Sequence, residues 1–134
     1  MDSYLLVKWA AITFGAAAAG GVLMLVIRLG GAPRPPSLVA MVHGLLAAAG
    51  LTMLILALAT VGVPLLAKFA IAALVVAASV GVWLNLRYHA ENLELPVRTI
   101  VVHAVFAVAG FVLLLLTLMP AAEAITGPER PFPS

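Results

Sequence analysis

The stretch SLVAMVHGLLAAAGLTMLILALA, residues 37–59, contains no aspartate, glutamate, lysine or arginine. At 1.5 Å of rise per residue, a helix of this length crosses the roughly 30 Å hydrocarbon core of a bilayer. Apolar stretches of similar length lie at 7–28, 65–86 and 96–119. The pattern predicts four transmembrane helices.

The composition of the whole chain agrees with a membrane protein. Of its 134 residues, 65% are hydrophobic and 9% are charged, whereas a soluble domain carries about 25% charged residues. The net charge of +2, without a basic run, gives no reason to expect nucleic acid as a partner. The chain has no cysteine, which excludes thiol catalysis and iron–sulfur clusters. The N-terminal sequence MDSYLLVKWA lacks the basic region of a cleavable signal peptide, so we expect the first apolar stretch to be retained.

Short segments separate the apolar stretches. Residues 30–37 and 60–65 carry glycine and proline, and 87–96 is polar. Such short connections make successive helices antiparallel neighbours. We therefore predict an all-α, integral membrane, up-down-up-down four-helix bundle in a single domain, 1–134, with a C-terminal tail at 120–134. Both termini then lie at one end, side A, and the connections 30–37 and 87–96 lie at the other end, side B.

The chain also contains an internal repeat. Residues 8–59 align with 68–119 at an offset of 60 without a gap. The scarce residue types that match are Lys8/Lys68, Gly21/Gly81, Pro36/Pro96, His43/His103 and Gly50/Gly110. We interpret the protein as two tandem helical hairpins of the same orientation, related by a pseudo-twofold axis along the membrane normal.

The repeated histidines are the candidate site. His43 follows Pro36 by seven residues and His103 follows Pro96 by seven, so both lie roughly 10 Å below side B. Ionisable groups inside a membrane face the protein interior and need a partner. Two imidazoles at one depth can be the axial ligands of one haem iron. We predict one bis-His haem b, in which each imidazole donates its other N–H to a backbone carbonyl one turn back, with the Thr99 hydroxyl near His103.

Small residues surround the predicted pair. Gly21 and Gly81 reach the same depth from the first and third helices, where they would leave room for a macrocycle. Gly44 and Ala104 directly follow the histidines. Small residues also permit close helix packing in membranes, and both interpretations remain open.

Arginines near side B could pair with the propionates of a haem. Arg28 and Arg87 lie at the ends of the first and third helices, and arginine suits bidentate pairing with carboxylates. The same residues bear on orientation, because cytoplasmic loops are enriched in lysine and arginine. Side B carries Arg28, Arg34, Arg87 and Arg98, and side A carries Lys8, Lys68 and Arg130. This small bias favours side B as the cytoplasmic side, with both termini outside.

A third histidine stands apart from the repeat. His89 aligns with Leu29 and follows Tyr88 near side B. The two residues fit the aromatic belt at a membrane surface, and they also fit a quinone headgroup site.

The segments MVHGLLAAAG (41–50) and VVHAVFAVAG (101–110) carry a resemblance to small bacterial four-helix b-type cytochromes of the cytochrome b561-like group. The resemblance is architectural and covers the whole bundle. It implies a protein of the bacterial inner membrane that binds haem b and transfers electrons. We predict that its partner is a quinone or a larger membrane redox complex of which it is a small subunit, or that it forms a homodimer. Members of that group often carry two haems and four ligands, whereas this chain offers one histidine pair within the membrane.

Other functions fit the same residues. In a non-catalytic accessory or assembly subunit, the histidines would only hydrogen-bond. In a pigment-binding protein, each would hold the magnesium of a chlorophyll. A proton or solute transporter is less favoured, because the apolar stretches carry no carboxylate. The sequence shows no catalytic carboxylate pair, nucleophile–base set or phosphate-binding loop, so an electron-transfer protein is more consistent with it than a bond-making enzyme.

Overall fold

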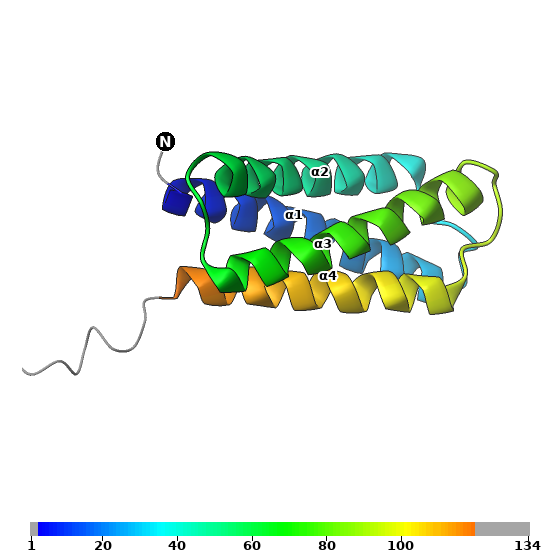
Figure 1. Cartoon of the computed structure of the whole chain (residues 1–134). Helices are drawn as coiled ribbons and strands as arrows, with labels where there is room; N and C mark the ends of the chain where they lie inside the picture. Colours follow the sequence, from blue (N-terminus) through cyan, green and yellow to red (C-terminus); the bar gives the residue numbers. More distant parts are fainter. Residues whose placement is uncertain (1–2, 120–134) are drawn as a thin grey trace, which may run out of the picture.

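The computed structural model of the chain describes residues 3–119, and the predicted tail 120–134 lies outside the described residues. The helices are α1 (Ser3–Leu29), α2 (Ser37–Thr60), α3 (Leu65–Leu84) and α4 (Val97–Leu118), and the π-helix η1 (Asn85–His89) continues α3. They form an antiparallel bundle in which α1 begins and α4 ends at the same end (Figure 1). The predicted all-α four-helix fold is confirmed.

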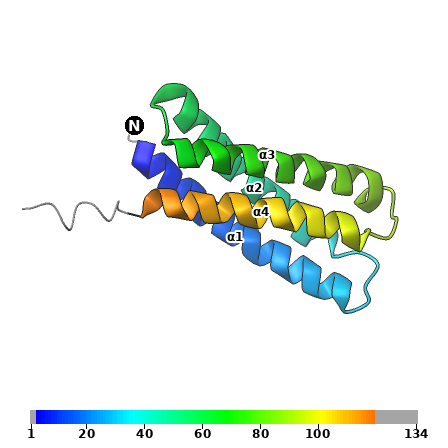
Figure 2. The ribbon, with the colours of Figure 1, turned by 60° about the horizontal axis from the view of Figure 1, so that its bottom comes forward.

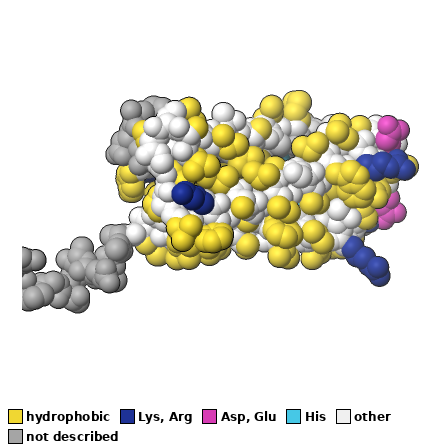
Figure 3. Space-filling model, viewed as in Figure 1, with side chains coloured by type: hydrophobic (Ala, Val, Ile, Leu, Met, Phe, Trp, Pro, Cys, Tyr) yellow, Lys and Arg dark blue, Asp and Glu magenta, His cyan; other side chains and the backbone are white. Residues whose placement is uncertain are grey.

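All four helices, with η1 counted as part of the third, are long and apolar enough to cross a membrane. Large apolar side chains such as Val22, Leu45 and Val105 are exposed on their outer faces. Figure 3 shows one such face, with apolar side chains along its length and charged ones near its two ends. A surface of this kind is stable in lipid and not in water, so the protein is a multi-pass membrane protein.

A proline directly precedes each of the last three helices. Pro36, Pro64 and Pro96 have φ of −59°, −57° and −73°, and their extended ψ places them just outside the helices that follow. The fourth helix therefore begins at Val97, one residue later than the sequence suggested. Gly62, after α2, has a φ of +75°, a left-handed conformation that glycine adopts without steric cost.

The bundle consists of two hairpins. Helix α1 packs mainly on α2 and α3 packs mainly on α4, and the hairpins meet less extensively along α1–α4 and α2–α3. In Figure 2 the α1–α2 hairpin crosses the α3–α4 hairpin at an angle. Helices α2 and α4 are therefore diagonal in the bundle, and side chains from both meet only at its axis.

The tightest packing lies toward side A and follows the 60-residue offset. Phe14 and its repeat equivalent Leu74 belong to one buried cluster. A Cβ added to Gly50 would lie 2.8 Å from Cε2 of Phe14, and one added to Gly110 would lie 2.7 Å from Cγ of Leu74. Each hairpin thus uses the same glycine position to admit a large side chain of its partner helix.

At side B, the connections between the helices are joined to each other. Arg28 donates from Nε to the carbonyl of Leu95 at 3.0 Å and forms an ion pair with Glu94. Arg34 hydrogen-bonds Asn92. These contacts tie the first hairpin to the connection inside the second.

Candidate functional site: a histidine pair at the bundle axis

His43 and His103 meet where the two hairpins face each other. Their ring centroids are 6.1 Å apart and the ring planes are inclined by 70°. Both side chains are half-buried. Since α2 and α4 are diagonal helices, this distance places the pair at the bundle axis, as their equal depth suggested.

Each imidazole is held by a backbone carbonyl. Nδ1 of His43 lies 2.8 Å from the carbonyl oxygen of Ala17, and Nδ1 of His103 lies 2.8 Å from that of Ala77. A carbonyl only accepts hydrogen bonds, so Nδ1 carries the proton and donates it. In the neutral imidazole, Nε2 then keeps its lone pair. We expected the acceptor one turn back on the same helix, but it lies on the neighbouring helix of the hairpin.

The repeated glycines explain why these carbonyls are accessible. Gly21 is four residues after Ala17, and Gly81 is four residues after Ala77. A helical side chain covers the turn that precedes it, so a glycine here leaves the carbonyl four residues earlier open. A Cβ on Gly21 would lie 3.2 Å from Cε1 of His43, and one on Gly81 would lie 3.1 Å from Cε1 of the other histidine. In this structure the space at both glycines is occupied by the imidazoles themselves.

The remaining predicted site residues are spread more widely. Gly44 is exposed, and a Cβ added there would meet nothing within 4 Å. Ala104 is half-buried. Arg28 forms its ion pair with Glu94 and its hydrogen bond with the Leu95 carbonyl at side B. Arg87 is exposed, with its guanidinium 6.0 Å from the ring centroid of Tyr88.

His89 does not join the pair. It is the last residue of η1, and its Nε2 lies 3.2 Å from Oγ of Ser37 at the start of α2. Its Nδ1 is buried and has no hydrogen-bond partner within residues 3–119. Neighbouring Tyr88 packs edge-on against Trp83, with ring centroids 5.2 Å apart.

The π-helix that carries these residues was not foreseen. Its register is visible in the hydrogen bond of 2.8 Å from the Ala90 amide to the carbonyl of Asn85, five residues earlier. π-Helical turns occur frequently at functional sites. The hydrophobic pattern carries no signal for such a turn, because the single extra residue falls in the polar segment NLRYH, where the apolar periodicity has ended.

The pair offers two imidazole nitrogens, Nε2 of His43 and Nε2 of His103, that could bind a metal ion. Metal–nitrogen bonds of about 2 Å would place two opposed Nε2 atoms roughly 4 Å apart. Each ring centroid is farther from the metal than its Nε2 atom, so the centroids are farther apart than the two nitrogens. The observed centroid separation of 6.1 Å is compatible with this arrangement. Two imidazoles alone leave most coordination positions of a metal ion to other ligands.

The packing around the pair is looser toward side B. The buried residues of α2 begin at Gly50 and those of α4 begin at Gly110, both on the side A side of the histidines. Interior positions of α2 and α4 nearer side B, such as Ala40 and Ile100, are only half-buried.

No protein-family model, curated protein or solved structure matches this chain. The function is therefore argued from the geometry and chemistry of the site itself.

Proposed function

We propose that the protein is a membrane b-type cytochrome that holds one haem b between His43 and His103. The observation that carries this proposal is the geometry of the pair. Two imidazoles from opposite hairpins lie 6.1 Å apart, and each donates Nδ1–H to a carbonyl, which leaves Nε2 for a metal. When bound, a haem supplies one-electron chemistry, in which its iron alternates between the ferric and ferrous states.

The chain's own residues would orient the ligands and set the environment of the iron. The carbonyls of Ala17 and Ala77 fix the tautomer of each ring and raise the basicity of Nε2. A dry, apolar environment is one of the factors that set a haem potential. In a bilayer, the apolar helices and the lipid around the pair would supply that environment. We expect Gly44 and Ala104 to line the site, with Arg87 near the propionates.

The electron partner in this proposal is a quinone in the bilayer or a larger membrane redox complex. Tyr88 and His89 lie at side B and offer hydrogen bonds to a quinone headgroup. The proposed setting is a bacterial inner membrane. The small excess of lysine and arginine at side B supports an orientation with both termini in the periplasm.

A second function is favoured by the same hydrogen bonds. His43 already ties α2 to α1, and His103 ties α4 to α3. Both rings also fill the space beside Gly21 and Gly81. This packing is what a structural histidine pair would show in a colourless accessory subunit, whose role would be to bind other membrane helices.

The optical spectrum of the purified protein separates these functions. Protein expressed with a haem precursor should show a Soret band and, after reduction with dithionite, a sharp α band, with one haem per chain. Colourless protein under these conditions would favour the accessory subunit. Far-red absorbance would instead identify a chlorophyll-type pigment and reject the haem.

A further inference from the structure

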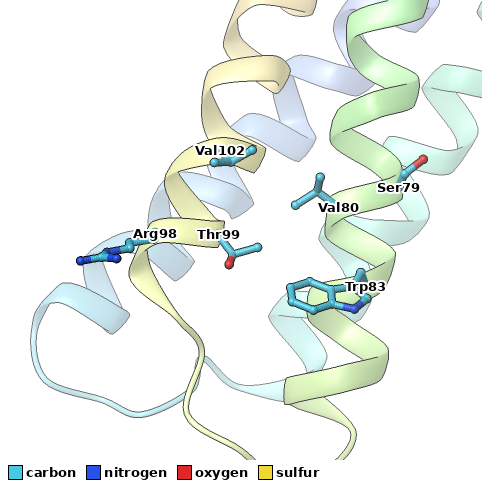
Figure 4. Close-up of a pocket in the computed structure, with 6 residues that line it drawn as sticks. All are labelled: Ser79, Val80, Trp83, Arg98, Thr99 and Val102. Atoms are coloured by element: carbon cyan, nitrogen blue, oxygen red, sulfur yellow. The ribbon is translucent and has the colours of Figure 1, made fainter.

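A cavity of about 440 Å³ opens between α3 and α4 near side B (Figure 4). Its lining residues are Ser79, Val80, Trp83, Arg98, Thr99 and Val102. The side chains of Trp83 and Val102 are about half exposed, at 48% each, so the cavity faces outward from the bundle. On a membrane-spanning hairpin, that side faces lipid.

The polarity of the cavity changes along its length. Val80 and Val102 line its part toward the membrane centre, whereas the Thr99 hydroxyl and the indole nitrogen of Trp83 lie toward the loop end (Figure 4). Arg98 extends from the outer rim, away from Trp83. Because the arginine is exposed and its side chain is long and flexible, its guanidinium can reach a group at the mouth of the cavity. This arrangement matches an amphiphile with its head at side B and its chain in the membrane.

The hydroxyl of Thr99 differs in its hydrogen bonding from those of the other threonines in the described helices. The hydroxyls that donate to the carbonyl four residues earlier are those of Thr13, Thr52, Thr60, Ser79 and Thr117. Thr99 makes no such bond, because Leu95 precedes the helix and its carbonyl accepts from Arg28 instead. Within residues 3–119, the Thr99 hydroxyl, the Trp83 indole and the Arg98 guanidinium have no hydrogen-bond acceptor in the protein. Three residues that line the cavity therefore carry hydrogen-bond donors without an acceptor in the protein.

The first hairpin supplies an internal comparison. Its equivalent cavity, of about 200 Å³, is lined by Ala16, Gly20, Leu38, Val39, Val42, His43 and Leu46. At the 60-residue offset, Leu38 stands where Arg98 is, and Val39 stands where Thr99 is. Trp83 likewise corresponds to Leu23. The shared fold produces a cavity in both hairpins. The donor of the first cavity, Nδ1 of His43, is already bonded to the Ala17 carbonyl, whereas the second cavity carries donors without a protein acceptor.

We propose that the cavity between α3 and α4 binds one anionic phospholipid. Its phosphate oxygens would accept hydrogen bonds from Arg98, Thr99 and Trp83, and an acyl chain would lie over Val80 and Val102. A phosphate is rich in acceptors, carries the charge that an unpaired arginine attracts, and in a bilayer sits at the interface where these donors lie. The proposal does not depend on the haem.

Tryptophan fluorescence tests this proposal in a bilayer. The chain has two tryptophans, so Trp9→Phe leaves Trp83 as the only one. This protein is reconstituted into phosphatidylcholine vesicles containing a small fraction of lipid with brominated acyl chains, which quench fluorescence on contact. Brominated phosphatidylglycerol should quench Trp83 at an about tenfold lower mole fraction than brominated phosphatidylcholine, because each charge-assisted hydrogen bond is worth about a factor of ten or more.

The repeat gives the matched variants. Arg98→Leu with Thr99→Val copies Leu38 and Val39 of the first hairpin, and it should remove the preference for phosphatidylglycerol. Arg87→Leu, which removes an exposed arginine of the same end outside the cavity, should retain it. If the double variant fails to insert, Arg98→Gln alone should still reduce the preference several-fold.

Several results would overturn the proposal. Equal quenching by both lipids would show that the cavity does not recognise the negative charge of the headgroup. An unchanged preference in the Arg98 variants would show that the anionic lipid binds elsewhere. Loss of the preference on adding inorganic phosphate would assign the site to the free ion. Displacement of phosphatidylglycerol by a short-chain quinone would assign it to a quinone.

Discussion

Replacing Gly110 by alanine is expected to destabilise the folded bundle by about 1–3 kcal/mol, the range for overpacking a well-packed core. The added Cβ would lie 2.7 Å from Cγ of Leu74 and 3.1 Å from the carbonyl oxygen of Ala70. The carbonyl belongs to the α3 backbone and cannot turn away, so the helices must separate. Gly50→Ala should also destabilise the protein, because its Cβ would lie 2.8 Å from the ring of Phe14.

Gly44→Ala is the matched control for this prediction. It changes the same residue type inside α2, but its Cβ would meet nothing within 4 Å. Alanine is the better helix former by about 1 kcal/mol in water, so this variant should lose no stability. The comparison is made by thermal unfolding in detergent, followed by circular dichroism. If the Gly110→Ala and Gly44→Ala variants have the same unfolding temperature, α3 and α4 do not pack as closely at Gly110 as described.

The second large effect concerns the histidines. His43→Ala and His103→Ala should each reduce the haem retained on purification at least tenfold, because even loss of an outer partner of a metal-bound histidine costs about 10–100-fold in affinity. The measurement is the haem content per chain together with the reduced spectrum. We expect any haem that remains to show a changed spectrum, because one axial position has become open.

His89→Ala is the control for the histidine variants. Its side chain contacts Ser37 at the start of α2 and takes no part in the central pair. We expect this variant to retain the haem content of the unmodified protein and an unaltered α band. If both the His43→Ala and His103→Ala variants retain the normal spectrum, these histidines are not the haem ligands.

The sequence predicts the arrangement of the helices and the meeting of the histidines for separate physical reasons. The bilayer thickness sets the length of an apolar span, so the four helices follow from composition. The repeat adds symmetry, which places His43 and His103 at one depth without any knowledge of helix rotation. Their separation of 6.1 Å agrees with that symmetry.

What the sequence leaves open depends on how the helices rotate and cross. Spacing along α2 does not show that His43 reaches across to the Ala17 carbonyl, because that contact requires α1 to present Gly21 toward α2. The sequence alone leaves both a space for a macrocycle and close helix packing open at this glycine, and in the structure its immediate neighbour is the imidazole. Similarly, Arg28 was assigned to a propionate, and the structure gives it Glu94 and a loop carbonyl, which only the fold of the connection 90–96 brings near.

The low-temperature EPR spectrum of the oxidised, purified protein tests the proposed haem site most directly. Two imidazoles bound to one ferric iron give a low-spin signal. Ring planes inclined by 70° make that signal strongly anisotropic, since the two iron d orbitals that interact with the rings become nearly equal in energy. We predict this low-spin, strongly anisotropic signal, with an intensity of one iron per chain. A high-spin ferric signal alone, which indicates an open axial position, or the absence of any haem iron would contradict the account.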